Sequence, residues 1–359
     1  FTYSLGRTYQ DGSLEGEEIK LDKTGLHITQ NDLLKQNQLV ENAATVMWNN
    51  NYTSYQLGVL LNAQSVGDND GGNIQHSSVS IFTSKRQNDL HWFGETALNN
   101  NSSIAFLGGV LFKSSTIKYL ISLRYYPANF RTYRAQPFSE WQGQNEGEKG
   151  IFQNVQLKYV KHVISIYSDI AEKIDENTLT TSNNIKYESG IRWQWFGKKH
   201  RFKTQLRKSN QLQTTQIYFP NPINYDIYRT TAKGQYQYQP TKNLDVRWQI
   251  NSTFYNNESQ GLGIETRFNW EIPNFVITGS WITANVDDYN GRVYFWDLNL
   301  PGEMRSLAVS DEKQLLGLKI KMKSKNNYQI YMRWRSAWDS MNFSGTADQR
   351  YALAIQIIL

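Results

Sequence analysis

Few side chains in this sequence have the types and the spacing that enzyme chemistry or metal binding requires. The five histidines are scattered and form no His-x-His or His-x3-His pair that could ligate a metal: His27, His76, His91, His162 and His200. Cysteine is absent, which excludes thiol chemistry, disulfides and Cys-ligated metals. Neither a Gly-x-Ser-x-Gly elbow nor a phosphate-binding Gly-Lys-Ser/Thr loop occurs. We therefore predict that the chain is not an enzyme and has no catalytic residue, cofactor or metal.

Two acidic clusters carry the oxygen ligands that Ca²⁺ prefers, Asp68–Asp70 and Asp287-Asp288. Neither has the spacing of a full calcium-binding loop. Both lie between segments that are predicted as strands, so we interpret them as solvated connections.

The elements that position the side chains are most evident in the C-terminal stretch Leu315–Leu359. Apolar residues alternate there with basic, small or polar ones, first around Ile320 and Lys321 and then around Met332 and Arg333. Successive side chains of a strand point to opposite faces, so each segment has one apolar and one charged face. An apolar face toward lipid and a charged face toward a wet lumen are typical of a transmembrane barrel.

Runs of the same period recur along the whole chain. They predict an all-β fold, a transmembrane antiparallel up-and-down β-barrel of about eighteen strands (16–20). Three strands belong to the C-terminal stretch, and the others are predicted at Phe1–Tyr9, 42–49, 54–65, 77–84, 89–98, 103–113, 116–127, 151–159, 162–172, 185–196, 201–212, 227–239, 243–254, 262–272 and 275–285.

Connections between these strands alternate between short and mostly long. The short ones, such as those at Lys198-Lys199 and Asn326, are expected in the periplasm. The long ones are expected outside the cell, among them 128–150, 286–314 and 337–349.

Charged residues on the polar side of the predicted strands are expected to face the lumen. On the lipid side, each Arg or Lys in mid-membrane would cost about 2–4 kcal/mol. The predicted lumen-facing residues are Arg192, Arg247, Arg267, Lys319, Lys321, Lys323, Arg333 and Arg335.

Residues 10–41 interrupt the regular pattern. They are acidic at first and then resemble a short helix that begins near Thr29. Within a single domain of residues 1–359, we predict this segment as a plug or cap of the lumen. Its acidic residues would pair with the basic inner face: Glu15, Glu17, Glu18 and Asp22. The alternative is a mobile external loop.

Composition agrees with a barrel. Among 359 residues, aromatics make up 14%, which fits rings at membrane interfaces, and no run of eighteen apolar residues could form a membrane-spanning helix. The net charge of +6 is interpreted as a mildly basic surface and lumen. No signal peptide is present, so we expect the sequence to be a mature or truncated product.

Several short stretches stand out along the chain: Gly25-Leu26-His27-Ile28-Thr29 with Asp32-Leu33, Arg124-Tyr125-Tyr126-Pro127, Asn145-Glu146, Gly150-Ile151-Phe152, Ser168-Asp169, Tyr294-Phe295 with Leu298, and Leu300-Pro301-Gly302. They resemble the barrel region of helix-hairpin-helix outer-membrane proteins of Bacteroidota. The resemblance implies an outer-membrane barrel in a Gram-negative envelope. The family's helix-hairpin-helix repeats are absent here.

Three classes of function follow. The first is a structural or accessory subunit of a larger cell-envelope complex, for barrel assembly or protein secretion, which we favour because a plugged lumen conducts poorly. The second is a porin-like channel for small polar or anionic solutes, and the third is a nucleic-acid uptake channel. In each case we expect an integral protein of the cell outer membrane. Its partners would be membrane lipid, lipopolysaccharide and other envelope proteins, while nucleic acid is not expected as a partner of this chain alone.

Overall fold

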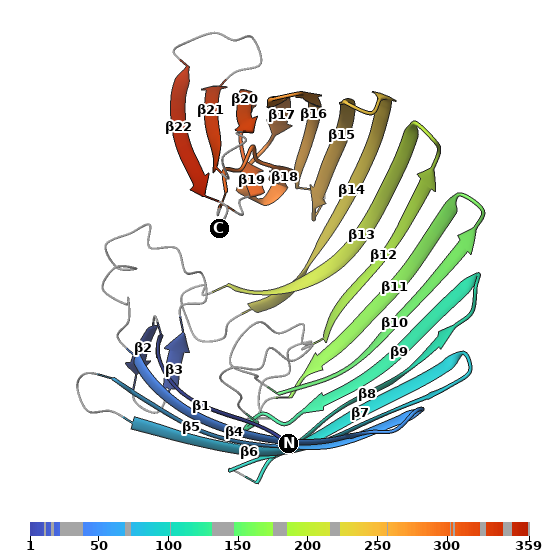
Figure 1. The fold of residues 1–359 in the computed structure, drawn as a ribbon, viewed down its shortest axis with the longest axis vertical. Helices are drawn as coiled ribbons and strands as arrows, with labels where there is room; N and C mark the ends of the chain where they lie inside the picture. Colours follow the sequence, from blue (N-terminus) through green and yellow to red (C-terminus); the bar gives the residue numbers. More distant parts are fainter. Residues whose placement is uncertain are drawn as a thin grey trace. The chain divides into compact units, whose positions relative to one another are not determined.

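The computed structural model is built almost entirely of β-strands (Figure 1). It describes residues 1–10, 12–15, 18–21, 39–68, 73–100, 102–130, 147–174, 185–215, 223–256, 258–301, 303, 306–323, 328–339 and 347–357. In this part of the chain, eighteen strands form one sheet, and every pair with an assigned register is antiparallel.

Each of the eighteen predicted segments overlaps one strand of the sheet, so the all-β class and the strand number are confirmed. The strands are β1 Thr2–Gln10, β4 Leu39–Asn51, β5 Tyr55–Asp68, β6 Asn73–Gln87, β7 Leu90–Asn99, β8 Ile104–Lys113, β9 Ile117–Tyr126, β10 Glu148–Tyr159, β11 His162–Lys173, β12 Ile185–Phe196, β13 His200–Thr215, β14 Ile223–Thr241, β15 Leu244–Tyr255, β16 Ser259–Ile272, β17 Phe275–Val286, β20 Lys313–Lys323, β21 Tyr328–Trp338 and β22 Asp348–Ile357.

Two small hairpins lie outside this sheet. One consists of β2 (Gly12–Glu15) and β3 (Glu18–Leu21), within the segment that was expected to be irregular. The other consists of β18 (Val293–Trp296) and β19 (Ser306–Val309), preceded by a 3₁₀ turn, η1 (Tyr289–Gly291). The prediction of 286–314 as a plain connecting loop was therefore wrong. The helix predicted from Thr29 lies outside the described residues.

The described residues group into two compact units. Unit 1 comprises Phe1–Ser114, Lys118–Gln153 and Asp169–Ile185, and unit 2 comprises Ser115–Ile117, Asn154–Ser168 and Lys186–Leu359. That the chain is a single domain stays a prediction.

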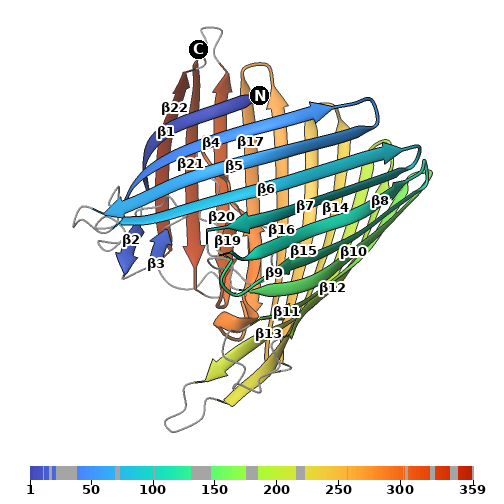
Figure 2. The ribbon, with the colours of Figure 1, turned by 90° about the horizontal axis from the view of Figure 1, so that it is seen from below.

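In unit 1, β1 pairs with β4, and β4 to β9 follow one another as antiparallel neighbours; Figure 2 shows β4 to β7 side by side. Leu61 of β5 and Val79 of β6 are paired, and both are exposed. One residue further along β6, Ser80 is buried. The apolar side chains therefore point outward from the unit and the polar ones point into it.

Unit 2 also exposes apolar side chains and buries polar ones, and the difference in exposed fraction is larger there. Ile250 and Ile264 are directly opposite each other on β15 and β16 and are 47% and 44% exposed. The adjacent pair, Gln249 and Glu265, is 2% and 0% exposed. We call the side of the sheet that carries Ile250 and Ile264 the apolar face, and the side that carries Gln249 and Glu265 the polar face.

Aromatic rings gather near the short turns of unit 2. Trp193 and Phe202 contact edge to face with their centroids 5.3 Å apart, and Tyr236 stacks on Trp248 at 5.6 Å. His200 at the start of β13 stacks on Tyr238 at 4.8 Å. These rings form a band at one end of β12 to β15. In the described part of the chain, no helix is long and apolar enough to cross a membrane.

Candidate functional site

The polar face of β15 to β21 carries like charges directly opposite one another. Arg247 of β15 pairs with Arg267 of β16, and Lys319 of β20 pairs with Arg333 of β21. Facing cations on neighbouring strands repel, so each pair requires carboxylates nearby. Arg335 lies two residues beyond Arg333 on the same face.

Glu265 supplies the carboxylate for the first pair. Its Oε2 accepts from Nη2 of Arg247 at 3.3 Å, and its Oε1 accepts from Nε of Arg267 at 2.7 Å. The Ser280 hydroxyl donates to the same Oε1 at 3.1 Å. Because this carboxylate is fully buried, its charge requires compensation by direct donors, which Arg247, Arg267 and Ser280 supply.

The second pair is compensated by a different part of the chain, the connection between β17 and β20. We call its residues 287–309 the inserted segment; Figure 1 shows its hairpin, β18 and β19, beside β17 and β20. Asp297 pairs with Arg335 at 2.5 Å. Glu303 pairs with Arg333, whose Nη2 lies 3.3 Å from Oε1 of the carboxylate. The inserted segment therefore supplies the carboxylates for β20 and β21, which contain no acidic residue.

The backbone of the inserted segment is also held by side chains of the polar face. Asn251 Nδ2 donates to the carbonyl oxygen of Tyr294 at 2.6 Å, and Lys319 Nζ donates to that of Asn299 at 3.1 Å. The Trp296 carbonyl accepts from Arg267, and the Leu298 carbonyl accepts from Arg333 at 3.3 Å. These donors satisfy backbone acceptors that pair with no strand of the large sheet.

Glycines on the strands make room for the inserted segment. A Cβ at Gly263 of β16 would lie 2.7 Å from the ring of Phe295, and a Cβ at Gly317 of β20 would lie 2.7 Å from Cδ1 of Leu298. Phe295 and Leu298 are buried, and Val293 of β18 joins Phe295 in an apolar cluster with Ile282 of β17. This cluster lies among charged groups, so packing and ion pairs act together.

The turn that begins the inserted segment is capped by an acidic pair. Asp288 is the N-cap of η1 and accepts from the Ser259 hydroxyl at 2.6 Å and from the backbone N–H of Asn290 at 2.7 Å. The hydrogen bond from Ser259, with those from the backbone, holds the pKa of Asp288 below its ordinary value. Asp287 accepts from the backbone N–H of Gln260 at 3.0 Å. In the described ranges, no group of three His, Cys, Asp or Glu side chains could hold a metal ion.

The structure brings together five of the residues that were predicted to face the lumen, Arg247, Arg267, Lys319, Arg333 and Arg335. Lys321 lies on the same face with its Nζ 5.4 Å from the ring centroid of Tyr331. Arg192 is exposed on β12, opposite Gln205 of β13. Lys323 is the last residue of β20, and its side chain lies outside the described residues. That these residues face a lumen stays a prediction.

The side chains of the predicted plug residues lie outside the part of the chain that the structure describes. Glu15 and Glu18 are opposite each other in the β2–β3 hairpin, and their side chains lie outside the described part. Glu17 and Asp22 are outside the described residues altogether. Plugging by residues 10–41 stays a prediction, whereas the inserted segment was not predicted to contact the charged face.

A second buried ion cluster lies in unit 1. Arg124 of β9 bonds to Glu148 of β10 and, through Nη1, to Asp169 of β11 at 2.8 Å. Gly150 lies beneath the guanidinium, since a Cβ there would be 2.6 Å from Cζ of Arg124. Sequence reasoning singled out Arg124, Gly150 and Asp169 as parts of the resemblance, but it did not predict that they meet.

Comparisons with known proteins do not assign a family. No family model matches the chain, and no curated protein matches it. The copper transporter OprC has 9% identity and a TM-score of 0.49, over 88% of this chain and 62% of its own. The alcaligin outer membrane receptor FauA from Bordetella pertussis has 10% identity and a TM-score of 0.44, over 88% of this chain and 57% of its own. OccK5 from Pseudomonas aeruginosa has 9% identity and a TM-score of 0.40, over 98% and 94%.

The chain thus spans less than two thirds of OprC and FauA. The relation to helix-hairpin-helix proteins of Bacteroidota stays a prediction.

Proposed function

We propose that this chain is an integral β-barrel protein of a Gram-negative outer membrane, in which the eighteen-stranded sheet closes and its apolar face contacts lipid. One observation carries this proposal: the paired Ile250 and Ile264 are exposed while the adjacent Gln249 and Glu265 are buried. A protein folded in water would bury the first pair and expose the second. In a bilayer the arrangement is favourable, because the solvent of the outer face is hydrocarbon.

The aromatic band agrees with this environment. Trp193, Phe202, Tyr236 and Trp248 lie near the short turns of β12 to β15, and aromatic rings are enriched at membrane–water interfaces. Short turns face the periplasm and long connections face outward in such barrels. This topology would place the turn at Lys198-Lys199 in the periplasm.

The biochemical role that the geometry favours is a structural or accessory subunit of a larger envelope complex, in barrel assembly or protein secretion. The inserted segment supports this role because it covers part of the polar face and is tied there by Asp297–Arg335 and Glu303–Arg333. A barrel whose interior is occupied by its own chain conducts poorly. Its function then depends on partner proteins and not on a solute.

The second candidate is a porin-like channel for small anionic solutes. The polar face of β12 to β14 supports it, because pairing brings Arg192, Lys203, Arg207 and Lys233 to one face with the carboxylate Glu188. Nucleic-acid uptake has no supporting observation in the described residues.

A register test decides whether the apolar face contacts lipid. Ile250→Arg places a charge in mid-strand and should destabilise the protein in lipid vesicles by about 2–4 kcal/mol. Tyr159→Arg, at the exposed last residue of β10, is the matched control and should be neutral. Urea unfolding of vesicle-inserted protein measures both. Equal stability of wild type and Ile250→Arg, with solubility in the absence of detergent, would show a soluble sheet.

Planar-bilayer recording and native mass spectrometry separate the two roles. An accessory subunit should show little or no steady conductance and should be purified with envelope proteins at fixed stoichiometry. Large, steady, anion-selective currents from the isolated chain would favour the channel.

A further inference from the structure

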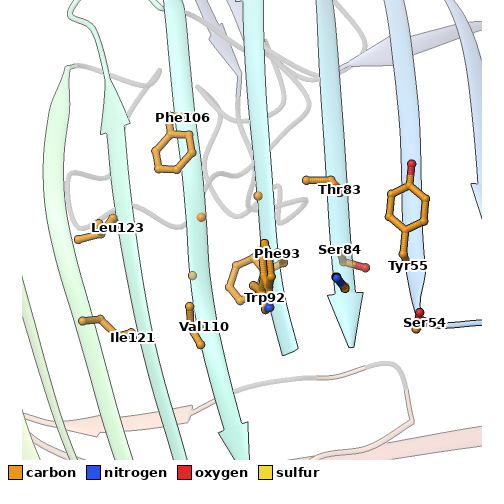
Figure 3. A pocket seen from close by; sticks show the side chains of 14 residues that line it. Ser54, Tyr55, Thr83, Ser84, Trp92, Phe93, Phe106, Val110, Ile121 and Leu123 are labelled. Carbon is orange, nitrogen blue, oxygen red and sulfur yellow. The ribbon is translucent and has the colours of Figure 1, made fainter. Parts of the chain in front are cut away.

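The side of unit 1 that carries the exposed Leu61 and Val79 is its apolar face, and this face is hollowed over β7, β8 and β9. The hollow has a volume of about 850 Å³ and lies within unit 1 (Figure 3). Its apolar side is formed by Trp92 of β7, Phe106 and Val110 of β8, and Ile121 and Leu123 of β9. Four of these side chains, those of Trp92, Phe106, Val110 and Leu123, are exposed.

Gly94 creates the depth of the hollow. Gly94 of β7 pairs with Gly108 of β8, and Gly108 pairs with Leu123. The ring of Phe106 covers Gly108, since a Cβ there would lie 2.7 Å from Cζ of that ring, so the uncovered position is Gly94. A Cβ at Gly94 would meet nothing nearer than the Leu107 carbonyl oxygen, at 3.9 Å. The space above Gly94 is therefore open to an apolar group from outside.

The opposite side of the hollow is polar. Ser54, Tyr55, Thr83 and Ser84 line it, with Lys85 beside Trp92 (Figure 3 labels the first four). Lys85 Nζ lies 5.6 Å from the centroid of the Trp92 ring. Ser54 lies in the turn before β5, Tyr55 begins β5, and the other three residues are in the last five positions of β6. They are therefore near the short connections, where the bilayer interface would lie.

An apolar hollow with hydroxyl groups and one ammonium at its edge has the polarity of an amphiphile. Lys85 can extend to the interface while its methylenes remain on apolar surface. Its charge complements a phosphate, and basic residues next to apolar grooves bind anionic lipid headgroups.

We propose that this hollow binds an acyl chain of an anionic phospholipid, whose phosphate interacts with Lys85. The proposal rests on the proposed function, because the apolar face must contact a bilayer. The acyl chain would lie over Gly94, between Trp92 and Leu123.

Native mass spectrometry of the full chain in detergent tests this proposal, with phosphatidylglycerol as the probe and phosphatidylcholine as the comparison. Gly94→Leu fills the hollow without meeting backbone and should abolish the bound phosphatidylglycerol. Thr96→Leu, two residues along the same strand and face, is the matched control and should retain it. Lys85→Gln should lower phosphatidylglycerol occupancy about five-fold, because a basic residue at the surface contributes about 1 kcal/mol toward anionic lipid.

Insertion of each variant into vesicles is measured in parallel. If wild type does not insert, the proposed function fails. If wild type inserts and Gly94→Leu keeps the same lipid occupancy, the lipid site alone is wrong. Preferential binding of lipopolysaccharide over phosphatidylglycerol, or a photocrosslinker at Val110 that joins to protein and not to lipid, would also overturn it.

Discussion

Gly263 of β16 lies directly beneath Phe295 of β18, and a Cβ at this glycine would be 2.7 Å from Cζ of the ring. The phenyl ring is buried, so it has little room to move aside. A larger side chain at Gly263 would therefore displace the inserted segment, although no residue of that segment is changed.

Gly263→Leu should therefore release the inserted segment from the polar face. We expect faster proteolysis within 287–309 and larger single-channel conductance than in wild type. Gly234→Leu is the control, because a Cβ there meets Cγ2 of Ile250 on the apolar face at 3.0 Å. Unchanged conductance and proteolysis in Gly263→Leu would show that this segment does not occlude a pore.

Glu265 accepts hydrogen bonds from both Arg247 and Arg267, and its negative charge offsets the repulsion between these two directly opposed cations. Glu265→Gln removes the negative charge between them, and loss of a buried partner of this kind costs about 3 kcal/mol. We expect that decrease in the free energy of unfolding, measured by urea titration in detergent. Glu258→Gln, at an exposed turn of the same hairpin, should change it little. A similar small effect of both substitutions would mean that the arginines are compensated without Glu265.

Arg124 holds two buried carboxylates, Glu148 and Asp169, on neighbouring strands. Arg124→Met leaves both anions without their shared cation and should destabilise the protein by about 4 kcal/mol. Arg350→Met removes an exposed pair with Asp348 and should cost less than about 1 kcal/mol. The ratio of the two unfolding free-energy changes is the measurement, and comparable values would contradict the buried cluster.

Val160 adopts a positive backbone angle, φ 48°, in the two-residue turn between β10 and β11. This conformation is unfavourable for a β-branched residue, and such strain costs about 1 kcal/mol or more. Val160→Asn should therefore raise the unfolding free energy by about 1 kcal/mol. The reciprocal change, Asn88→Val at φ 53° in the β6–β7 turn, should lower it. If Val160→Asn is neutral, the turn has relaxed to another geometry.

The sequence by itself determined the strands and the chemical character of each face. Ile250 and Ile264 alternate with Gln249 and Glu265 because a strand turns successive side chains to opposite sides. This period-two signal is local and needs no information on distant contacts. The strand number followed for the same reason, and the polar side of β15 to β21 was identified residue by residue.

Only the tertiary structure decided what lies against that polar side. The burial of Phe295 and Leu298 in the inserted segment depends on Gly263 and Gly317, which come from strands on either side of that segment in the sequence. Likewise, Arg124 meets Glu148 and Asp169 because sheet pairing aligns β9 with β10, which a long connection separates in the sequence, and β11 follows β10 after a two-residue turn. Such contacts depend on which strands become neighbours and on the space between side chains. The alternation of apolar and polar residues within one strand contains no information about either.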